Sequence, residues 1–412
     1  MKRIMIAVLI LIMIIPAVWA AEDYGTPGEF LTWGAGARSL GMGKAFTGLA
    51  DDPSAVIYNP GGLAQQNPFQ ISLMSVMLFE GTFYDFAALT LPFSGIGTFA
   101  LGYVRLDSGG FDLRDDFWNA VPEADNLYSQ GIYFSYSRDI LDSLAAGASL
   151  KIVNQQIFDM GGTGFGADLG IIYTPMEYFS AGLAVLNIMP PSVLIDEATE
   201  TYPVVIRLGL AGRLAGERIM PTLDIEKEMS GKDVKIRMGV EVIPMENLAL
   251  RAGFDETEIT FGAGYKIMRN YIVDYSMSVQ ELGITHRASF TFATGGFDVN
   301  LTAEPKLFSP VGVRKTTTIS IYASTKYPVI EWEMSIINEN DDVVRFYSGY
   351  DRPPEQIIWD GKDDRGLPVS DGEYKCVMKV IDKNRRTIQS APETVRISSS
   401  LPMNRGTIHL EE

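Results

Sequence analysis

Two residue types that carry much of protein chemistry are nearly missing from this sequence. Cys376 is the single cysteine, so no disulfide can form within the chain. The two histidines, His286 and His409, have no cysteine or second histidine at metal-ligand spacing. We therefore expect no catalytic residues, no metal site and no bound cofactor. Alternation places Cys376 on one face with Tyr374 and Met378, which predicts a small buried hydrophobe rather than a reactive thiol.

Positive charge is also scarce. The chain has 34 basic and 51 acidic residues among its 412, a formal net charge of −17. A nucleic-acid partner requires a basic surface, so we exclude this class of partner.

Long apolar runs are confined to the N-terminus. Lys2 and Arg3 precede an unbroken apolar run over residues 4–15, and small residues around Ala20 follow it. This order predicts a signal peptide over residues 1–20, with a run too short to span a bilayer comfortably. We expect an exported protein that is either soluble or a β-barrel.

Glycine, by contrast, is abundant, and the middle of the chain alternates with period two. In one such segment Phe165, Ala167, Leu169 and Ile171 share a face. About fourteen segments of this kind, each about 9–11 residues long, suit tilted strands that cross a bilayer. We predict a 14-stranded antiparallel transmembrane β-barrel over residues 67–296. A soluble all-β fold also alternates and is the other interpretation.

The lengths of the connections favour the membrane. Those near residues 94–95, 174–177, 243–246 and 268–270 are expected to be tight. Long loops are expected over residues 107–127, 154–163 and 187–203, and this asymmetry is typical of outer-membrane barrels. The first long loop carries Phe111, Phe117 and Trp118, which we expect outside, where they could bind a surface partner.

Two further regions flank the barrel. Residues 21–66 are rich in glycine and turn residues, which predicts an N-terminal plug of short helices and turns. Residues 304–398 have shorter strand patterns and polar turns, which predict a small β-sandwich, and residues 399–412 are expected to be a polar tail.

The glycine-rich segment resembles the entry motif of PorV/PorQ-like proteins, relatives of the FadL outer-membrane transporters. The matching stretches are residues 36–43, 50–55 and 59–63, and the similarity extends over about residues 34–292. Gly61 departs mildly, since the family usually has alanine there. The motif residues carried over are Arg38, Gly41, Gly43, Asp51, Asp52, Asn59 and Pro60.

The C-terminal part resembles a FlgD-type immunoglobulin-like domain. The motif consists of Trp359, Asp360, Gly361, Asp363, Gly366, Gly372 and Tyr374. Asp360, Asp363 and Asp364 could ligate calcium, but no bidentate glutamate ends the loop. Turn formation is the favoured role for these aspartates.

Charged residues on the inward face of the predicted strands allow two interpretations. They could line a path for a solute or form a salt-bridge network, and we favour the network. Arg38 and Asp51 are the plug residues expected to pair with them, whereas His286 is expected on the lipid side. The inward set is Arg207, Lys235, Arg237, Glu241, Arg251, Lys266 and Arg287.

The resemblance implies two functions. We expect no enzyme activity, because no nucleophile–base pair or metal cluster appears in the sequence. PorV-like relatives imply a scaffold or shuttle in protein secretion or cell-surface assembly, with envelope or secreted proteins as partners. FadL-like relatives imply an outer-membrane transporter with a hydrophobic ligand in the barrel. A barrel with an even number of strands ends on the side where it began. We therefore expect both chain ends, including the sandwich, in the periplasm.

Overall fold

The computed structural model describes residues 26–79, 81–109, 114, 117–119, 127–245, 247–256, 258–268, 270–280, 283–294, 298–310, 315–325, 328–383 and 387–399. The predicted signal peptide and nearly all of the predicted tail lie outside these residues. The chain forms two compact units, one extending in the main to Ala293 and the other from Thr294. Among the described residues, none of the helices is long and apolar enough to cross a membrane.

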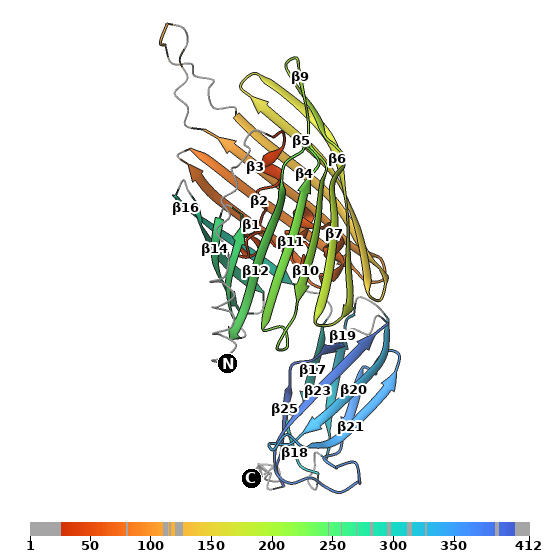
Figure 1. Cartoon of the computed structure of the whole chain (residues 1–412). Coiled ribbons are helices and arrows are strands. Elements are labelled where there is room, and N and C mark those ends of the chain that lie inside the picture. Colours follow the sequence, from red (N-terminus) through yellow and green to blue (C-terminus); the bar gives the residue numbers. More distant parts are fainter. Residues whose placement is uncertain are drawn as a thin grey trace, which may run out of the picture. The chain divides into compact units, whose positions relative to one another are not determined.

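The first unit is a closed antiparallel β-barrel, as the alternation predicts (Figure 1). Around the barrel the strands follow the order β1-β16-β15-β14-β13-β12-β11-β10-β7-β6-β5-β4-β3-β2, which makes fourteen. The first seven strands are β1 (Phe69–Phe79), β2 (Thr82–Phe93), β3 (Gly97–Ser108), β4 (Leu127–Leu141), β5 (Leu144–Ile157), β6 (Met160–Met176) and β7 (Phe179–Met189). The other seven are β10 (Val205–Gly212), β11 (Ile219–Glu228), β12 (Val234–Met245), β13 (Leu248–Asp255), β14 (Glu258–Ile267), β15 (Tyr271–Gln280) and β16 (Gly283–Thr294).

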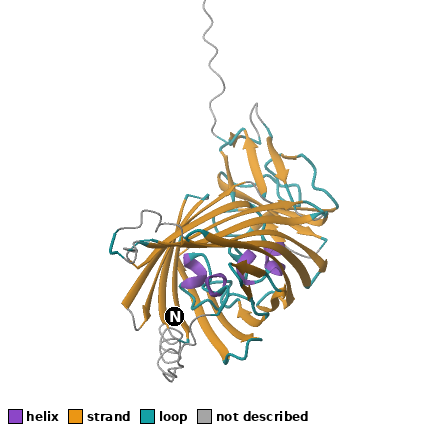
Figure 2. Cartoon of the chain, turned by 90° about the horizontal axis from the view of Figure 1, so that it is seen from above, coloured by secondary structure: helices purple, strands orange, loops and turns teal. Residues whose placement is uncertain are grey.

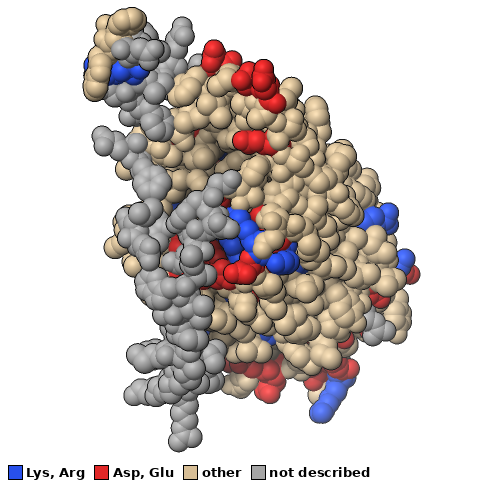
Figure 3. Space-filling view, turned by 45° about the horizontal axis from the view of Figure 1, so that its top comes forward, with Lys and Arg blue, Asp and Glu red and all other residues tan. Residues whose placement is uncertain are grey.

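The outer face of the wall is apolar and the inner face is buried. On β6 the side chains of Phe165, Leu169 and Ile171 are exposed, whereas Asp168 between them is buried. In Figure 3 most of the visible surface is uncharged, with one central patch of charged groups and others at its margins. This surface would be unstable in water over so many strands, but it matches the hydrocarbon of a bilayer.

The two ends of the barrel differ in their connections. We call the end that carries the β3–β4 and β7–β10 connections the long-connection end, and the opposite end the short-connection end. The β7–β10 connection contains a hairpin of its own, formed by β8 (Ser192–Ile195) and β9 (Ala198–Thr201).

One expected long loop is wrong. Residues 154–163 continue β5 and β6 and reverse in a turn at Phe158 and Asp159. The polar residues there suggested a loop. In the barrel they belong to strand ends, where Asn154 faces outward and Gln155 faces inward to accept from the hydroxyl of Tyr202.

The second unit consists of two β-sheets around one core. One sheet has the order β17-β19-β22 and the other the order β18-β25-β23-β20-β21, with β24 paired to β23. Core residues come from both sheets, among them Ile319, Trp359, Met334 and Met378. The strands are β17 (Val299–Glu304), β18 (Leu307–Phe308), β19 (Thr317–Ala323), β20 (Val329–Ile337), β21 (Val343–Tyr350), β22 (Gln356–Trp359), β23 (Gly372–Asp382), β24 (Thr387–Gln389) and β25 (Glu393–Ile397).

Candidate functional site

The glycine-rich N-terminal segment fills the barrel as a plug. It contains four short helices: η1 (Glu29–Leu31), α2 (Ala37–Leu40), α3 (Ala55–Tyr58) and η2 (Pro60–Gln65). Viewed along the barrel, these helices lie inside the ring of strands (Figure 2). Met42, Phe46, Leu49 and Leu63 are fully buried, so the plug contributes the main apolar core of this unit.

Plug backbone lies directly against inward-facing glycines of the wall. A Cβ atom added to Gly253 would lie 2.2 Å from the amide nitrogen of Gly43, and one added to Gly182 would lie 2.1 Å from the carbonyl oxygen of Thr47. Both distances are too short for any side chain. We call the following wall residues, each of which a plug atom approaches, the glycine girdle: Gly102, Gly131, Gly147, Gly170, Gly182, Gly209, Gly239, Gly253 and Gly262.

Arg38 joins two parts of the plug to the wall. Its guanidinium pairs with Glu241 on β12 through Nε and Nη2, at 3.0 and 2.9 Å. Nη1 of the same guanidinium contacts Asp51 Oδ1 at 2.5 Å and Asp52 Oδ2 at 3.2 Å. Burial raises the pKa of Asp52, although Arg38 opposes that shift. Of the two predicted plug partners for the wall, Arg38 therefore contacts it directly, and Asp51 acts through Arg38.

Lys44 begins a second chain of ion pairs that sequence reasoning missed. Its Nζ lies 2.6 Å from Asp255 Oδ2, at the end of β13. Asp255 in turn accepts from Arg237, and Arg237 donates to Glu226 at 2.7 Å. Glu226 also pairs with Arg207. These contacts agree with the favoured interpretation of the inward charges as a network. The sequence signal that could have pointed to Lys44 was its position directly after the glycine turn at Gly43.

Asn59 and Asp224 hold two plug turns by hydrogen bonds to backbone. Asn59 Oδ1 accepts from the amide of Gly61 at 3.0 Å, and its Nδ2 donates to the carbonyl oxygens of Thr47 and Ile171. Pro60 follows as the first residue of η2. Asp224 on β11, also missed, accepts from the amides of Phe46 and Thr47 at 3.0 and 2.8 Å.

The plug runs along the lumen from the long-connection end to the short-connection end. Strands β1 and β16 do begin and end at the short-connection end. The first described residues, however, lie at the other end, because Gly28 packs against the ring of Tyr202 in the β7–β10 connection. The strands of the barrel thus begin and end on one side, whereas the described plug begins at the other. Both chain ends lie outside the described residues, and their expected position in the periplasm stays a prediction.

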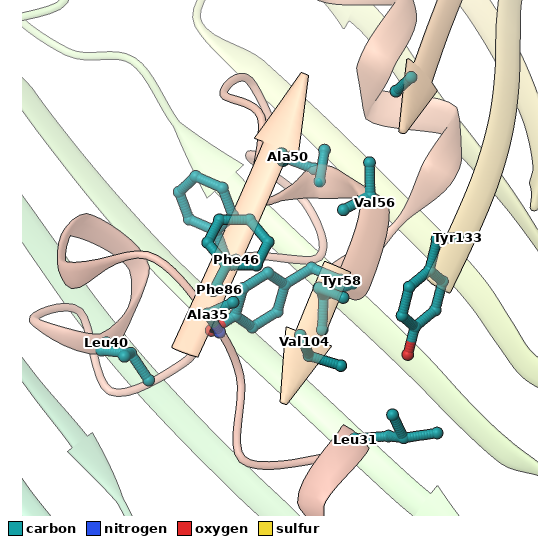
Figure 4. Close-up of a cluster of buried hydrophobic side chains, with 14 of the residues drawn as sticks. Leu31, Ala35, Leu40, Phe46, Ala50, Val56, Tyr58, Phe86, Val104 and Tyr133 are labelled. Atoms are coloured by element: carbon teal, nitrogen blue, oxygen red, sulfur yellow. Dashed lines mark hydrogen bonds between the residues drawn. The ribbon is translucent and has the colours of Figure 1, made fainter. Parts of the chain in front are cut away.

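Apolar side chains occupy the lumen next to β1–β6. At the long-connection end, Leu31 packs beside Val104, and the ring of Trp33 lies 5.7 Å from that of Tyr84. Figure 4 shows part of this packing, with Leu31 of the plug near Val104 and Tyr133 of the wall. We call the following set the mouth cluster: Leu31, Trp33, Tyr84, Val104, Tyr133, Val153, Val193, Ile195 and Tyr202.

A polar site interrupts the wall beside the mouth cluster. Lys151 Nζ lies 2.6 Å from Asp168 Oδ1, and both side chains are buried. The same oxygen accepts from the amide of Asn187, which has a left-handed backbone with φ of 55°. Pairing between β6 and β7 is irregular here, because three residues of β7, 186–188, face one residue of β6.

In the second unit the predicted motif forms a turn. Asp363 Oδ1 accepts from the amides of Arg365 and Leu367, at 2.9 and 2.8 Å. Asp360 accepts from the amide of Lys362, and Asp364 from that of Phe346 on β21. No acidic, cysteine and histidine cluster within the described residues could hold a metal ion. The hydrogen bonds of Asp360 and Asp363 to backbone amides agree with the favoured interpretation as turn residues.

The other motif residues complete this turn. Trp359 Nε1 donates to the carbonyl oxygen of Lys362 at 2.9 Å, and its ring packs edge-on against Tyr374. Gly361 and Gly366 have left-handed backbone with φ of 70° and 80°, and Gly372 begins β23. Cys376 is fully buried, and burial raises the pKa of its thiol to about 12.

Three other predicted residues lie on the barrel surface. His286 faces outward, where its Nδ1 lies 2.6 Å from the hydroxyl oxygen of Tyr275. Phe117 and Trp118 are 86% and 78% exposed in the β3–β4 connection. Phe111 lies outside the described residues.

No protein-family model and no curated protein matches the chain. Solved structures that resemble it include a toluene transporter and a FadL homologue. The Pseudomonas putida toluene transporter TodX is 15% identical, with 63% of this chain and 96% of that chain covered and a TM-score of 0.45. A Pseudomonas aeruginosa FadL homologue is 12% identical, with 61% and 97% covered and a TM-score of 0.42. The fold assignment depends on the strand pairing of this chain itself. The resemblance to PorV/PorQ-like proteins and to a FlgD-type domain stays a prediction.

Proposed function

We propose that this protein is an outer-membrane transporter of small hydrophobic molecules, of the FadL type. The observation that carries the proposal is the division of the lumen into two sides. Beside β10–β16 the lumen is packed with ion pairs that hold the plug, whereas beside β1–β6 it holds the apolar mouth cluster next to the ion pair of Lys151 with Asp168. A hydrophobic molecule gains free energy only on the apolar side, so the mouth cluster is its binding site.

The position of the mouth cluster suits entry from outside the cell. Trp33 and Leu31 come from the plug, Tyr84 and Val104 from the wall, and Val193 from the β8–β9 hairpin. Movement of the hairpin or of the first plug residues would expose these side chains to a ligand. The ion pairs of Arg38 and Lys44 would keep the rest of the plug in place meanwhile.

Binding and uptake by the purified full-length protein test this function. Reconstituted in liposomes, the protein should bind the fluorescent probe 1-N-phenylnaphthylamine saturably and speed its entry. Trp33→Ala should weaken binding, because it removes an aromatic wall from the mouth cluster. Trp118→Ala, which alters an exposed tryptophan at the same end, is the matched control and should bind normally. Uptake no faster than in empty liposomes would refute transport of such molecules.

A scaffold in secretion or surface assembly is the second candidate, and a feature of the second unit favours it. Strand β21 is the last strand of its sheet and carries Tyr350, whose side chain is 80% exposed, and Phe346, at 43%. Exposed aromatic residues on a sheet edge suit a protein partner. The chain leaves β16 at the short-connection end, so we place this unit in the periplasm.

Crosslinking followed by mass spectrometry distinguishes the two candidates. Full-length protein and a chain ending at Thr294 would be recovered from outer membranes and their crosslinked proteins compared. A scaffold should lose specific partners with the truncation. A transporter should keep probe uptake in the truncated form and show no such loss.

A further inference from the structure

The outward face of the barrel carries a row of polar side chains on four neighbouring strands. Gln130 on β4 is in direct register with Arg105 on β3 and with Asn154 on β5. Asn154 is in register with Thr163 on β6. These four residues, which we call the polar row, stand on the same outward face as Phe134, Leu150 and Phe165, which are exposed.

The polar row lies at a boundary of the apolar band. In the next outward row, Tyr103, Ile132, Ile152 and Phe165 are in register, and apolar rows follow below it. On β4 the outward face beyond Gln130 carries no charge until Arg138, which is exposed and lies eight residues further along the strand. Arg138 therefore marks the other boundary of the apolar band. Eight residues span about 27 Å along a strand, or about 20 Å across a bilayer at the usual tilt. This thickness approaches the apolar band of outer-membrane barrels, so the polar row meets lipid headgroups.

Side chains of the polar row are already ordered by hydrogen bonds to one another. The hydroxyl of Tyr103 donates to Gln130 Oε1 at 3.2 Å, and Gln130 Nε2 donates to Asn154 Oδ1 at 3.5 Å. Asn154 Nδ2 donates to the carbonyl oxygen of Gly162 and to Thr163 Oγ1, both at 3.1 Å. A ligand would therefore meet a row that loses little conformational entropy on binding.

The chemistry of the row selects among headgroups. Gln130 Nε2 keeps one N–H beyond its bond to Asn154, the amide oxygens of Gln130 and Asn154 can each accept a second hydrogen bond, and the Thr163 hydroxyl can donate. Sugar hydroxyls also donate and accept, whereas a phosphate group only accepts. Arg105 does not give the row a net positive charge, because its guanidinium is paired with Asp107: Nε and Nη2 donate to Asp107 Oδ2 at 3.0 and 2.6 Å. The row is thus close to neutral and suits a neutral, hydroxyl-rich group.

We propose that the polar row binds the sugar headgroup of a glycolipid in the leaflet at the long-connection end. The acyl chains of that lipid would lie along Ile132, Ile152 and Phe165, directly below the amides. This site is on the outside of the wall and is independent of any ligand in the lumen. It requires the barrel to be in a membrane but not that the barrel transports anything.

Native mass spectrometry of the full-length protein from mixed nanodiscs tests the proposal. Phosphatidylcholine discs would contain equal small amounts of digalactosyldiacylglycerol, which is neutral, and phosphatidylglycerol, which is anionic. Wild-type protein should retain the galactolipid preferentially. The double variant Gln130→Ala/Asn154→Ala should retain about tenfold less, since two sets of hydrogen bonds are lost.

Arg138→Ala is the matched control, because it alters an outward residue of β4 at the opposite boundary. It should retain the galactolipid as the wild type does. Heat-modifiable gel migration would verify that each barrel is folded, and the two single substitutions would replace a double variant that fails this check. Unchanged galactolipid retention in the folded variants, or wild-type preference for phosphatidylglycerol, would overturn the proposal.

Discussion

Arg38 of the plug and Glu241 of strand β12 form a two-point ion pair although 203 residues separate them in the sequence. Glu241 also pairs with Arg251 of β13, and Arg251 with Asp274 of β15. The plug is therefore connected to three strands of the wall through one guanidinium. This arrangement leads to the first prediction.

Replacing Arg38 with methionine should loosen the plug. The substitution leaves Asp51, Asp52 and part of Glu241 without their cation, in surroundings that are mostly buried. Removing one partner of a buried ion pair lowers the free energy of unfolding by about 3–5 kcal/mol. We expect higher and noisier conductance in planar bilayers. Arg138→Met, on the outward face, should conduct like the wild type; equal traces for both variants would contradict a role for Arg38 in retaining the plug.

Adding a methyl group to the glycine girdle should displace the plug from the wall. In Gly253→Ala the new Cβ would meet the amide nitrogen of Gly43 at 2.2 Å, and backbone cannot move aside as a side chain can. We expect a lower temperature for the heat-modifiable shift on gels. Gly216→Ala is the control, since a Cβ there meets nothing within 4 Å although φ is +66°. An equal or larger effect of the control would argue against the girdle.

The thiol of Cys376 should be unreactive in the folded second unit. Burial raises its pKa from 9.0 to about 12, so the thiolate fraction at pH 8 falls about a thousandfold. Because a raised pKa removes thiolate at a given pH, alkylation should remain slow until the pH or a denaturant unfolds the unit. Iodoacetamide labelling followed by mass spectrometry measures this. Rapid labelling of native protein at pH 8 would show that the thiol is accessible.

Trp359→Ala should unfold the second unit more easily while leaving the barrel folded. Its ring is fully buried against Phe308 and Tyr374, and truncating such a residue costs about 3–5 kcal/mol. Labelling of Cys376 at increasing urea should shift to lower concentrations, and the heat-modifiable band of the barrel should persist. Tyr350→Ala, at an 80% exposed position, should leave the labelling curve unchanged. Simultaneous loss of the barrel band would mean that the two units do not unfold independently.

Much of the architecture could be predicted from local patterns. Alternation sorts the side chains of a strand such as β6 into two faces whatever their partners, so the barrel and its inward charges were predictable. Composition likewise predicted a plug of short helices around Gly41 and Gly43. Hydrogen-bonding turn residues near Asp363 predicted a turn there.

Other features depend on which segments meet after the barrel closes. Residues 154–163 looked like a loop because they are polar, and only the pairing of β5 with β6 shows that they extend two strands. The local sequence does not say which carboxylate Lys44 meets or which amides donate to Asp224. These two residues meet Asp255 and the amides of Phe46 and Thr47 because barrel closure brings β11 and β13 to the plug.

The sequence by itself thus determined the period of the strands, the face on which each side chain lies and the composition of the plug. These properties depend on neighbouring residues and are encoded locally. The tertiary structure alone decided which carboxylate each plug cation meets, in which direction the plug runs and where the polar row ends the apolar band. Those properties depend on strand register and on closure of the sheet, which bring together residues as distant as Arg38 and Glu241.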